Sequence, residues 1–71
     1  MNIKKGVYKH YKGNTYEVIA IANHSETMEK MVVYKALYGD GALWVRPASL
    51  WNEEIDLNGK KVSRFELLEE K

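Results

Sequence analysis

Apolar and aromatic residues gather in short runs along this chain, and glycine or asparagine separates one run from the next. The densest stretch is 30–47, KMVVYKALYGDGALWVRP, in which two such runs flank the tripeptide Gly-Asp-Gly. β-branched and aromatic side chains favour pleated strands, and glycines supply the positive backbone angles that a tight reversal needs. This stretch therefore predicts a central β-hairpin.

The segments 7–11 (VYKHY) and 15–23 (TYEVIAIAN) predict an N-terminal hairpin. The dipeptide Gly-Asn between them is a two-residue turn signal, and a turn there places Tyr11 opposite Tyr16. The second segment carries apolar residues at both odd and even positions. We therefore expect both of its faces to be covered, as happens where one strongly coiled strand serves two sheets.

After the central hairpin, the proline of LWVRP ends a strand, and 48–52 (ASLWN) predicts a single helical turn. The segments 53–57 and 60–64 flank an Asn-Gly dipeptide, which is the strongest short-range hairpin signal in the chain. The turn that it predicts pairs Asp56 with Lys61, a favourable cross-strand arrangement of opposite charges.

Together these elements predict an all-β fold of five to six short, strongly bent antiparallel strands with one helical turn. A small SH3-like barrel is the expected architecture, and an OB-type barrel is the alternative, although it usually needs more residues and a helix between its strands. A chain of 71 residues forms one domain, 1–71, because it buries only about 60% of its unfolded surface. Residues 1–5 and 69–71 are expected to fray.

Composition narrows the function classes. There is no cysteine, which excludes a disulfide framework and a thiolate metal site. The net charge of +1 argues against binding that depends on a large positive field over the whole chain. No stretch has the apolar length of a membrane-spanning helix, and the N-terminus lacks the apolar core of a secretory signal. A cytoplasmic location in a microbe is the resulting expectation.

Four stretches in order, GVYKHYKGNTYEV, HSETMEKMVVYKALYG, LWVRP and DLNGKKVSRF, carry a family resemblance. At this spacing the chain resembles the bacterial domain of unknown function 1653 family, over nearly its whole length from Gly6 to Leu67. The resemblance implies a small stand-alone bacterial protein with an SH3-like β fold. It implies no activity, because the family has no settled function.

The chain offers little for catalysis or for metal and cofactor binding. Its two histidines, His10 and His24, lie in different elements without close-spaced partners, whereas zinc requires three or four protein ligands. His24, Ser25 and Glu26 are adjacent, so their side chains point in different directions and do not form a catalytic triad. We therefore expect no catalytic residues, no metal and no cofactor. An enzyme that acts on a small molecule through His24 and Glu26 is a remote alternative.

Strand 43–47 alternates aliphatic residues with Trp44 and Arg46. If Leu43 and Val45 face the core, Trp44 and Arg46 stand together on an outer face, to which the neighbouring strand adds Tyr34 or Tyr38. Tryptophan, tyrosine and arginine are the residues favoured at binding hot spots.

The alternative is that Trp44 belongs to the core and that Arg46 only forms an ion pair with Glu53 or Glu54. A small barrel needs its large aromatic side chains inside, which favours this alternative slightly.

The main functional hypothesis is a non-catalytic binding module, either a monomer or a weak homodimer. It presents Tyr34, Trp44 and Arg46, together with His24 and Glu26 of the polar loop 24–30, to an unknown protein or peptide partner. The second hypothesis is a nucleic-acid-binding module that contacts phosphates through lysines near the first and last hairpins. These lysines are Lys4, Lys5, Lys9, Lys12, Lys60 and Lys61.

Overall fold

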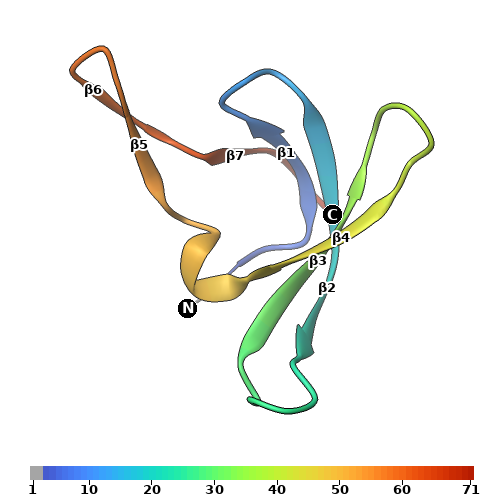
Figure 1. Ribbon diagram of the computed structural model, residues 1–71. Coiled ribbons are helices and arrows are strands. Elements are labelled where there is room, and N and C mark those ends of the chain that lie inside the picture. Colours follow the sequence, from blue (N-terminus) through green and yellow to red (C-terminus); the bar gives the residue numbers. More distant parts are fainter. Residues whose placement is uncertain (1–2) are drawn as a thin grey trace.

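The computed structural model describes residues 3–71, which form seven strands and one 3-10 helical turn (Figure 1). The strands are β1 (Gly6–His10), β2 (Thr15–Asn23), β3 (Lys30–Ala36), β4 (Leu43–Pro47), β5 (Glu54–Leu57), β6 (Lys60–Ser63) and β7 (Phe65–Glu70), and the helical turn is η1 (Ala48–Leu50). The predicted all-β class and the predicted helical turn are confirmed. The number of strands exceeds the five to six expected, because β7 follows the predicted C-terminal hairpin.

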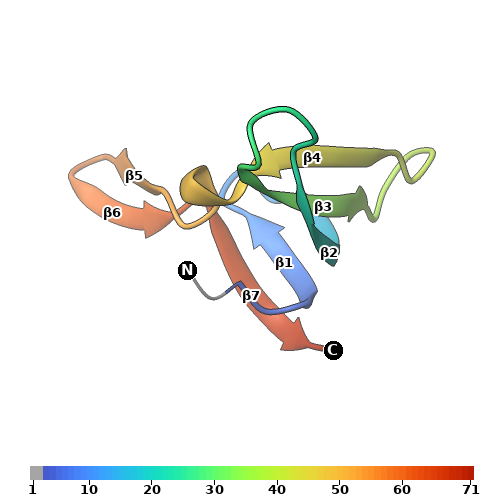
Figure 2. The same ribbon diagram turned by 90° about the horizontal axis from the view of Figure 1, so that it is seen from below.

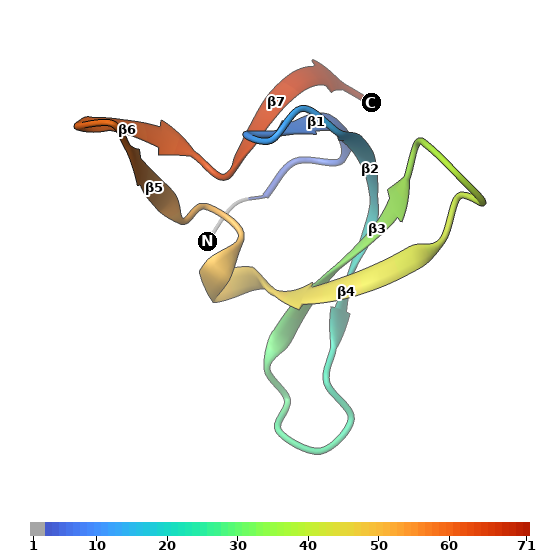
Figure 3. The same ribbon diagram turned by 45° about the horizontal axis from the view of Figure 1, so that its top comes forward.

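Five strands form one antiparallel sheet in the order β4-β3-β2-β1-β7, and β5 pairs only with β6 in a separate hairpin. Figure 3 shows the sheet curling round, with η1 at its open side, and Figure 2 shows the β5–β6 hairpin standing away from it. The expected barrel is not closed, because β4 and β7 are the two edges of the sheet and do not pair with each other. This order, with the last strand added beside the first, is nevertheless that of a small SH3-like fold.

The central hairpin forms as predicted, with β3 and β4 in register from Met31 opposite Pro47 to Lys35 opposite Leu43. Its turn depends on glycine. Gly41 has φ +68°, and an added Cβ there lies 3.0 Å from Cε of Lys35. A residue with a side chain is therefore strained at this position.

The register predicted for the N-terminal hairpin is wrong. Tyr16 lies opposite Tyr8 rather than Tyr11. The backbone N–H of His10 donates to the carbonyl oxygen of Asn14 at 2.7 Å, so the turn is longer than the Gly-Asn pair suggests. The physical reason is the core. The observed register places Tyr8 on the same face as Tyr16, whereas a shift of the pairing by one residue would move every side chain of the strand to the opposite face.

The prediction that both faces of β2 are covered is also wrong. Val18 is buried, but Ile19 and Ile21 are 42% and 41% exposed. The pairing of β2 with β3 shifts between Val18 and Ala20, which marks a β-bulge at Ile19. A bulge increases the local twist and turns the end of the strand away from the core. Strand β2 therefore has apolar residues at both odd and even positions because the bulge changes which of them face the core. It does not have them because a second layer covers its other face.

The C-terminal hairpin has the predicted register, including Asp56 opposite Lys61. The chain end differs from the expectation of loose residues at 69–71. Strand β7 continues to Glu70, which lies opposite Gly6, and the backbone N–H of Lys71 donates to Lys5 at 3.0 Å. A Cβ on Gly6 would lie 2.1 Å from the carbonyl oxygen of Glu69, so only glycine allows this approach. Of the other expected frayed residues, 1 and 2 lie outside the described part of the chain.

The core is centred on Trp51, which is fully buried and stacks on Phe65 with ring centroids 3.9 Å apart. Tyr8 packs edge-on against Trp51 at 5.4 Å. Pro47, with φ −56°, ends β4, and the N–H of Trp51 then closes the 3-10 turn on the carbonyl of Ala48. The turn thus folds the indole of Trp51 into the open side of the sheet.

Candidate binding site

The side chain of Trp44 is exposed, at 53% of its maximal surface. It lies directly opposite Tyr34 in the β3–β4 ladder, and directly opposed residues share a face of the sheet. Tyr34 packs edge-on against Trp51 and Phe65, with ring centroids 5.0 and 5.8 Å away. The alternative that Trp44 belongs to the buried core is therefore wrong, because Trp51 takes that place.

The orientation of β4 that would place Trp44 and Arg46 on an outer face is not the one observed. That orientation required Leu43 and Val45 to face the core, but they are 64% and 62% exposed. Because Tyr34 packs on the core, Trp44 lies on the inner face of the curled sheet, at its open end, and the aliphatic pair lies on the outer face. Leu43, Trp44 and Val45 are all exposed, so neither face of the N-terminal half of β4 is covered.

Two more tyrosines extend this inner surface. The ring of Tyr16 lies 5.4 Å from that of Tyr34 and 5.5 Å from that of Tyr38, in both cases edge-on. The hydroxyls of Tyr16 and Tyr38 share a hydrogen bond of 2.8 Å. Burial, together with this hydrogen bond, raises the pKa of Tyr16 to about 12. We call Tyr16, Tyr34, Tyr38 and Trp44 the aromatic face.

Arg46 borders the aromatic face and belongs to a cluster of three charges. One carboxylate oxygen of Glu53 lies 3.5 Å from Arg46 and 2.7 Å from Arg64. The ion pair expected between Arg46 and Glu53 is therefore present. Two guanidinium groups share one carboxylate, and Nε of Arg46 is buried without a hydrogen-bond partner within residues 3–71. The cluster of Arg46, Arg64 and Glu53 therefore has a net positive charge.

The polar loop 24–30 lies away from the aromatic face. Figure 1 shows the β2–β3 loop at the opposite end of β3 from the β3–β4 turn, which is adjacent to Trp44. Nδ1 of His24 accepts the backbone N–H groups of Glu26 at 3.2 Å and of Thr27 at 3.3 Å. His24 thus holds the shape of its own loop. The structure brings together Tyr34, Trp44 and Arg46 of the predicted site but not His24 and Glu26.

The six lysines of the nucleic-acid hypothesis do not form one stripe. Lys4 is paired with Glu70 at 3.6 Å, beside the end of β7. Lys60 lies opposite Leu57 and Lys61 opposite Asp56, so the two lysines point to opposite faces of the β5–β6 hairpin. Lys5 lies near Lys4 at the start of the chain. The remaining two, Lys9 and Lys12, lie at the end of β1 and in the turn that follows it.

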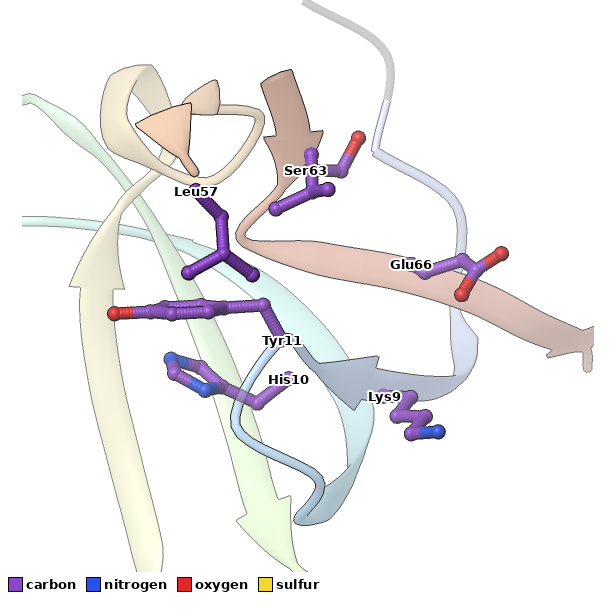
Figure 4. Close-up of a pocket in the computed structure, with 7 residues that line it drawn as sticks. Lys9, His10, Tyr11, Leu57, Ser63 and Glu66 are labelled. Carbon is purple, nitrogen blue, oxygen red and sulfur yellow. The ribbon is translucent and has the colours of Figure 1, made fainter. Parts of the chain in front are cut away.

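A cavity of about 380 Å³ lies between the β5–β6 hairpin and the ends of β1 and β7 (Figure 4). It is lined by Lys9, His10, Tyr11, Leu57, Val62, Ser63 and Glu66. No single stretch of sequence indicates it, because its walls come from segments more than forty residues apart. The one available signal was the predicted register of the C-terminal hairpin, which fixes that Leu57 and Val62 share a face.

His10 and Tyr11 form one wall of the cavity, with ring centroids 4.7 Å apart. Nδ1 of His10 accepts the backbone N–H of Lys12 at 3.1 Å, which leaves Nε2 to carry the proton of the neutral ring. Burial lowers the pKa of His10 below its usual value, and the positive charges of Arg64, Lys12 and Arg46 act in the same direction. His10 is therefore neutral at physiological pH.

Other chemistries find little support in the described region. Within residues 3–71 no group of three or more His, Asp or Glu side chains is placed to hold a metal ion. The same residues contain no helix that is long and apolar enough to cross a membrane.

Comparison with known proteins assigns the family. A model of the family described as protein of unknown function (DUF1653) matches residues 6–67. The chain belongs to the DUF1653 family. The resemblance carried by its four sequence motifs is thus confirmed. A crystal structure of a DUF1653 protein from Bordetella bronchiseptica is 33% identical, with a TM-score of 0.88 over 99% of this chain and 92% of that one. No curated protein matches this DUF1653 chain.

Proposed function

We propose that this DUF1653 protein is a non-catalytic binding module that holds an extended peptide segment of a partner protein against Trp44, Tyr34 and Arg46. One observation carries the proposal: Trp44 is 53% exposed and lies directly opposite a tyrosine that packs against the core. A large apolar ring in water gains free energy when a partner covers it.

The rigidity of the aromatic face supports the proposal. Tyr34 is packed against Trp51, and Tyr16 is held by ring contacts with Tyr34 and Tyr38. Side chains that are already ordered lose little conformational entropy when a partner binds. The aromatic face therefore suits a binding surface better than a set of mobile exposed side chains would.

Strand β4 supports an extended partner segment. In the described part of the chain, β4 pairs with β3 only, so its outer edge presents backbone N–H and C=O groups without strand partners. A peptide that adds to a free edge gains main-chain hydrogen bonds, and its alternate side chains then meet one face of the sheet. Here that inner face carries Trp44 and Arg46.

The charges beside the aromatic face define the partner further. Arg46 and Arg64 share the single carboxylate of Glu53. The excess positive charge favours a peptide that carries an aspartate or glutamate next to an apolar residue. The acidic group would meet Arg46 while the apolar side chain covers Trp44.

Selection of random peptides on the immobilised protein tests this function. Enriched peptides are titrated into ¹⁵N-labelled protein, and the amide shifts are mapped. We expect the largest shifts at Tyr34, Trp44 and Arg46. Trp44→Ala should weaken binding by about 2 kcal/mol or more, roughly 30-fold. Leu68→Ala is the control, because Leu68 is equally exposed, at 53%, but lies on β7.

The proposal fails if no peptide is enriched over the Trp44→Ala protein. It also fails if Leu68→Ala weakens binding as much as Trp44→Ala does.

A further inference from the structure

We propose that the cavity between the β5–β6 hairpin and the ends of β1 and β7 is a nucleotide-binding site. The base enters the cavity, and its phosphate lies at the mouth, where Lys60 and Lys12 approach. The volume of about 380 Å³ is within the range of about 300–1,000 Å³ of small-molecule sites.

The walls of the cavity suit a flat ring. Figure 4 shows the ring of Tyr11 with Leu57 above it and His10 on its other side. Leu57 and Val62 line the cavity from the hairpin, and Leu57 is 45% exposed, so this aliphatic surface is in water when the cavity is empty. A base that enters between Tyr11 and the two aliphatic side chains stacks on the ring and covers them.

The polar groups of the cavity can pair with the edge of a base. The hydroxyl of Ser63 both donates and accepts hydrogen bonds, and the edge of a nucleobase carries donors and acceptors side by side. Figure 4 shows Glu66 and Lys9 farther from the Tyr11 ring, with Lys9 pointing away from it. These two charged side chains are exposed to solvent and do not select the ring.

The positive charges at the mouth of the cavity favour an anionic ligand. Residues that face each other across an antiparallel pair share a face, so Lys60, opposite Leu57, lies on the cavity side of the hairpin. Nζ of Lys12 and Cζ of Arg64 each lie 5.9 Å from the centre of the Tyr11 ring. Lys9, Lys12, Lys60 and Arg64 outnumber the carboxylates of Glu66, of Glu53 and of Glu54, which lies opposite the lining residue Ser63.

The nucleotide site is separate from the aromatic face. Lys9 and Glu66 are partners in the β1–β7 ladder, and they point away from the core that their neighbours Tyr8 and Phe65 enter. Trp44 and Tyr34 lie on the inner face of the sheet instead. The two proposals share the Arg64–Glu53 ion pair, and the ring of His10 lies 6.4 Å from that of Tyr16, but the variants that test them are at different residues.

Titration of the full chain with adenosine monophosphate, followed by ¹H–¹⁵N spectra, tests the nucleotide site. Adenosine and inorganic phosphate are titrated separately, because adenosine carries the base without the phosphate and inorganic phosphate carries the anion without the base. We expect the monophosphate to shift the amides of Tyr11, Leu57 and Val62 and to bind at least about tenfold more tightly than either of these two ligands.

Two variants of one hairpin give the matched comparison. Lys60→Glu should weaken adenosine monophosphate roughly tenfold, whereas Lys61→Glu makes the same change in net charge on the opposite face and should weaken it less than about threefold. Both positions are exposed, so neither variant threatens folding.

Three results overturn the nucleotide site: no shift at the cavity residues up to about 10 mM ligand, equal affinity for inorganic phosphate alone, or equal effects of the two lysine variants. Thymidine monophosphate and a strand of five thymidines then separate two sources of the same chemistry. Tighter, strongly salt-dependent binding of the strand supports a single-stranded nucleic acid, and equal binding supports a free nucleotide. Either result supports the site.

Discussion

Trp51 and Trp44 lie seven positions apart and occupy opposite surroundings. Trp51 is fully buried and stacks on Phe65 at 3.9 Å, whereas Trp44 is 53% exposed on an edge strand. The 3-10 turn between them folds the first indole inward and leaves the second at the open end of the sheet. One tryptophan thus completes the core, and the other stays exposed to solvent.

Tyr34 connects the two regions. One side of its ring packs against Trp51, and its cross-strand neighbour is Trp44. Burial raises the pKa of its hydroxyl above the usual value, while the charge of Arg46 lowers it in part. The exposed Trp44 therefore lies across the strand pair from a tyrosine that packs on the core.

Trp51→Ala should have the largest effect of any single change. Replacing a fully buried tryptophan by alanine costs about 3–5 kcal/mol, and the whole fold is worth roughly 4–10 kcal/mol. We expect Trp51→Ala to be largely unfolded in urea titrations followed by circular dichroism. Trp44→Ala should cost less than about 1 kcal/mol. Equal losses of stability in the two variants would contradict the division between core and surface.

Tyr34→Ala should come next, because it damages both regions. The ring is partly buried, so we expect a loss of about 2 kcal/mol in the free energy of unfolding. Peptides selected on the wild-type protein should also bind less tightly. Tyr34→Phe keeps the ring and should retain most of the stability and affinity. A Tyr34→Ala protein that is as stable as the wild type would show that Tyr34 does not link Trp44 to the core.

Alkaline pH should weaken the aromatic face before it affects the stack of Trp51 on Phe65. The pKa of Tyr16 is raised to about 12 in the folded protein, whereas an unfolded tyrosine titrates near 10. The folded state thus holds the proton more tightly, so stability is full below about pH 10 and falls as pH rises towards 12. Absorbance at alkaline pH should show Tyr16 titrating late, and Tyr16→Phe should remove that late step. An unchanged titration curve in Tyr16→Phe would count against the hydrogen bond between Tyr16 and Tyr38.

Glu53→Gln should have a smaller effect. Its carboxylate neutralises two arginines, but it is 40% exposed, so solvent screens much of the interaction. We expect a loss of about 1 kcal/mol or less in stability, smaller still at high salt. Glu54→Gln, at the adjacent exposed position, is the control and should change nothing measurable. A larger loss of stability in Glu54→Gln than in Glu53→Gln would mean that the ion pairs of Glu53 with Arg46 and Arg64 do not stabilise the fold.

Much of the fold was predictable from local patterns. The runs around Gly39 to Gly41 and around Asn58-Gly59 gave the two later hairpins, because glycine at a tight turn and alternating apolar residues are local signals. The pairing of Tyr8 with Tyr16 was not predictable from the Gly-Asn pair. The register is set by which side chains must face the core, and the length of the turn adjusts to that register.

The candidate site was predictable only in part. Tyr34, Trp44 and Arg46 follow from the alternation along β3 and β4, but alternation alone does not say which face is inside. The answer depends on Trp51, which reaches the core only after the chain turns at Pro47. The cavity by Tyr11 depends in turn on contacts between distant segments.

Fluorescence quenching of the two single-tryptophan proteins tests the central claim most directly. Trp51→Phe leaves Trp44 as the reporter and keeps an aromatic ring in the core, and Trp44→Phe leaves Trp51. With acrylamide as the quencher, we predict that Trp44 emits to the red and is quenched several-fold more readily than Trp51. A Trp44 that is blue-shifted and as protected as Trp51 would contradict the exposed aromatic face and, with it, the proposed function.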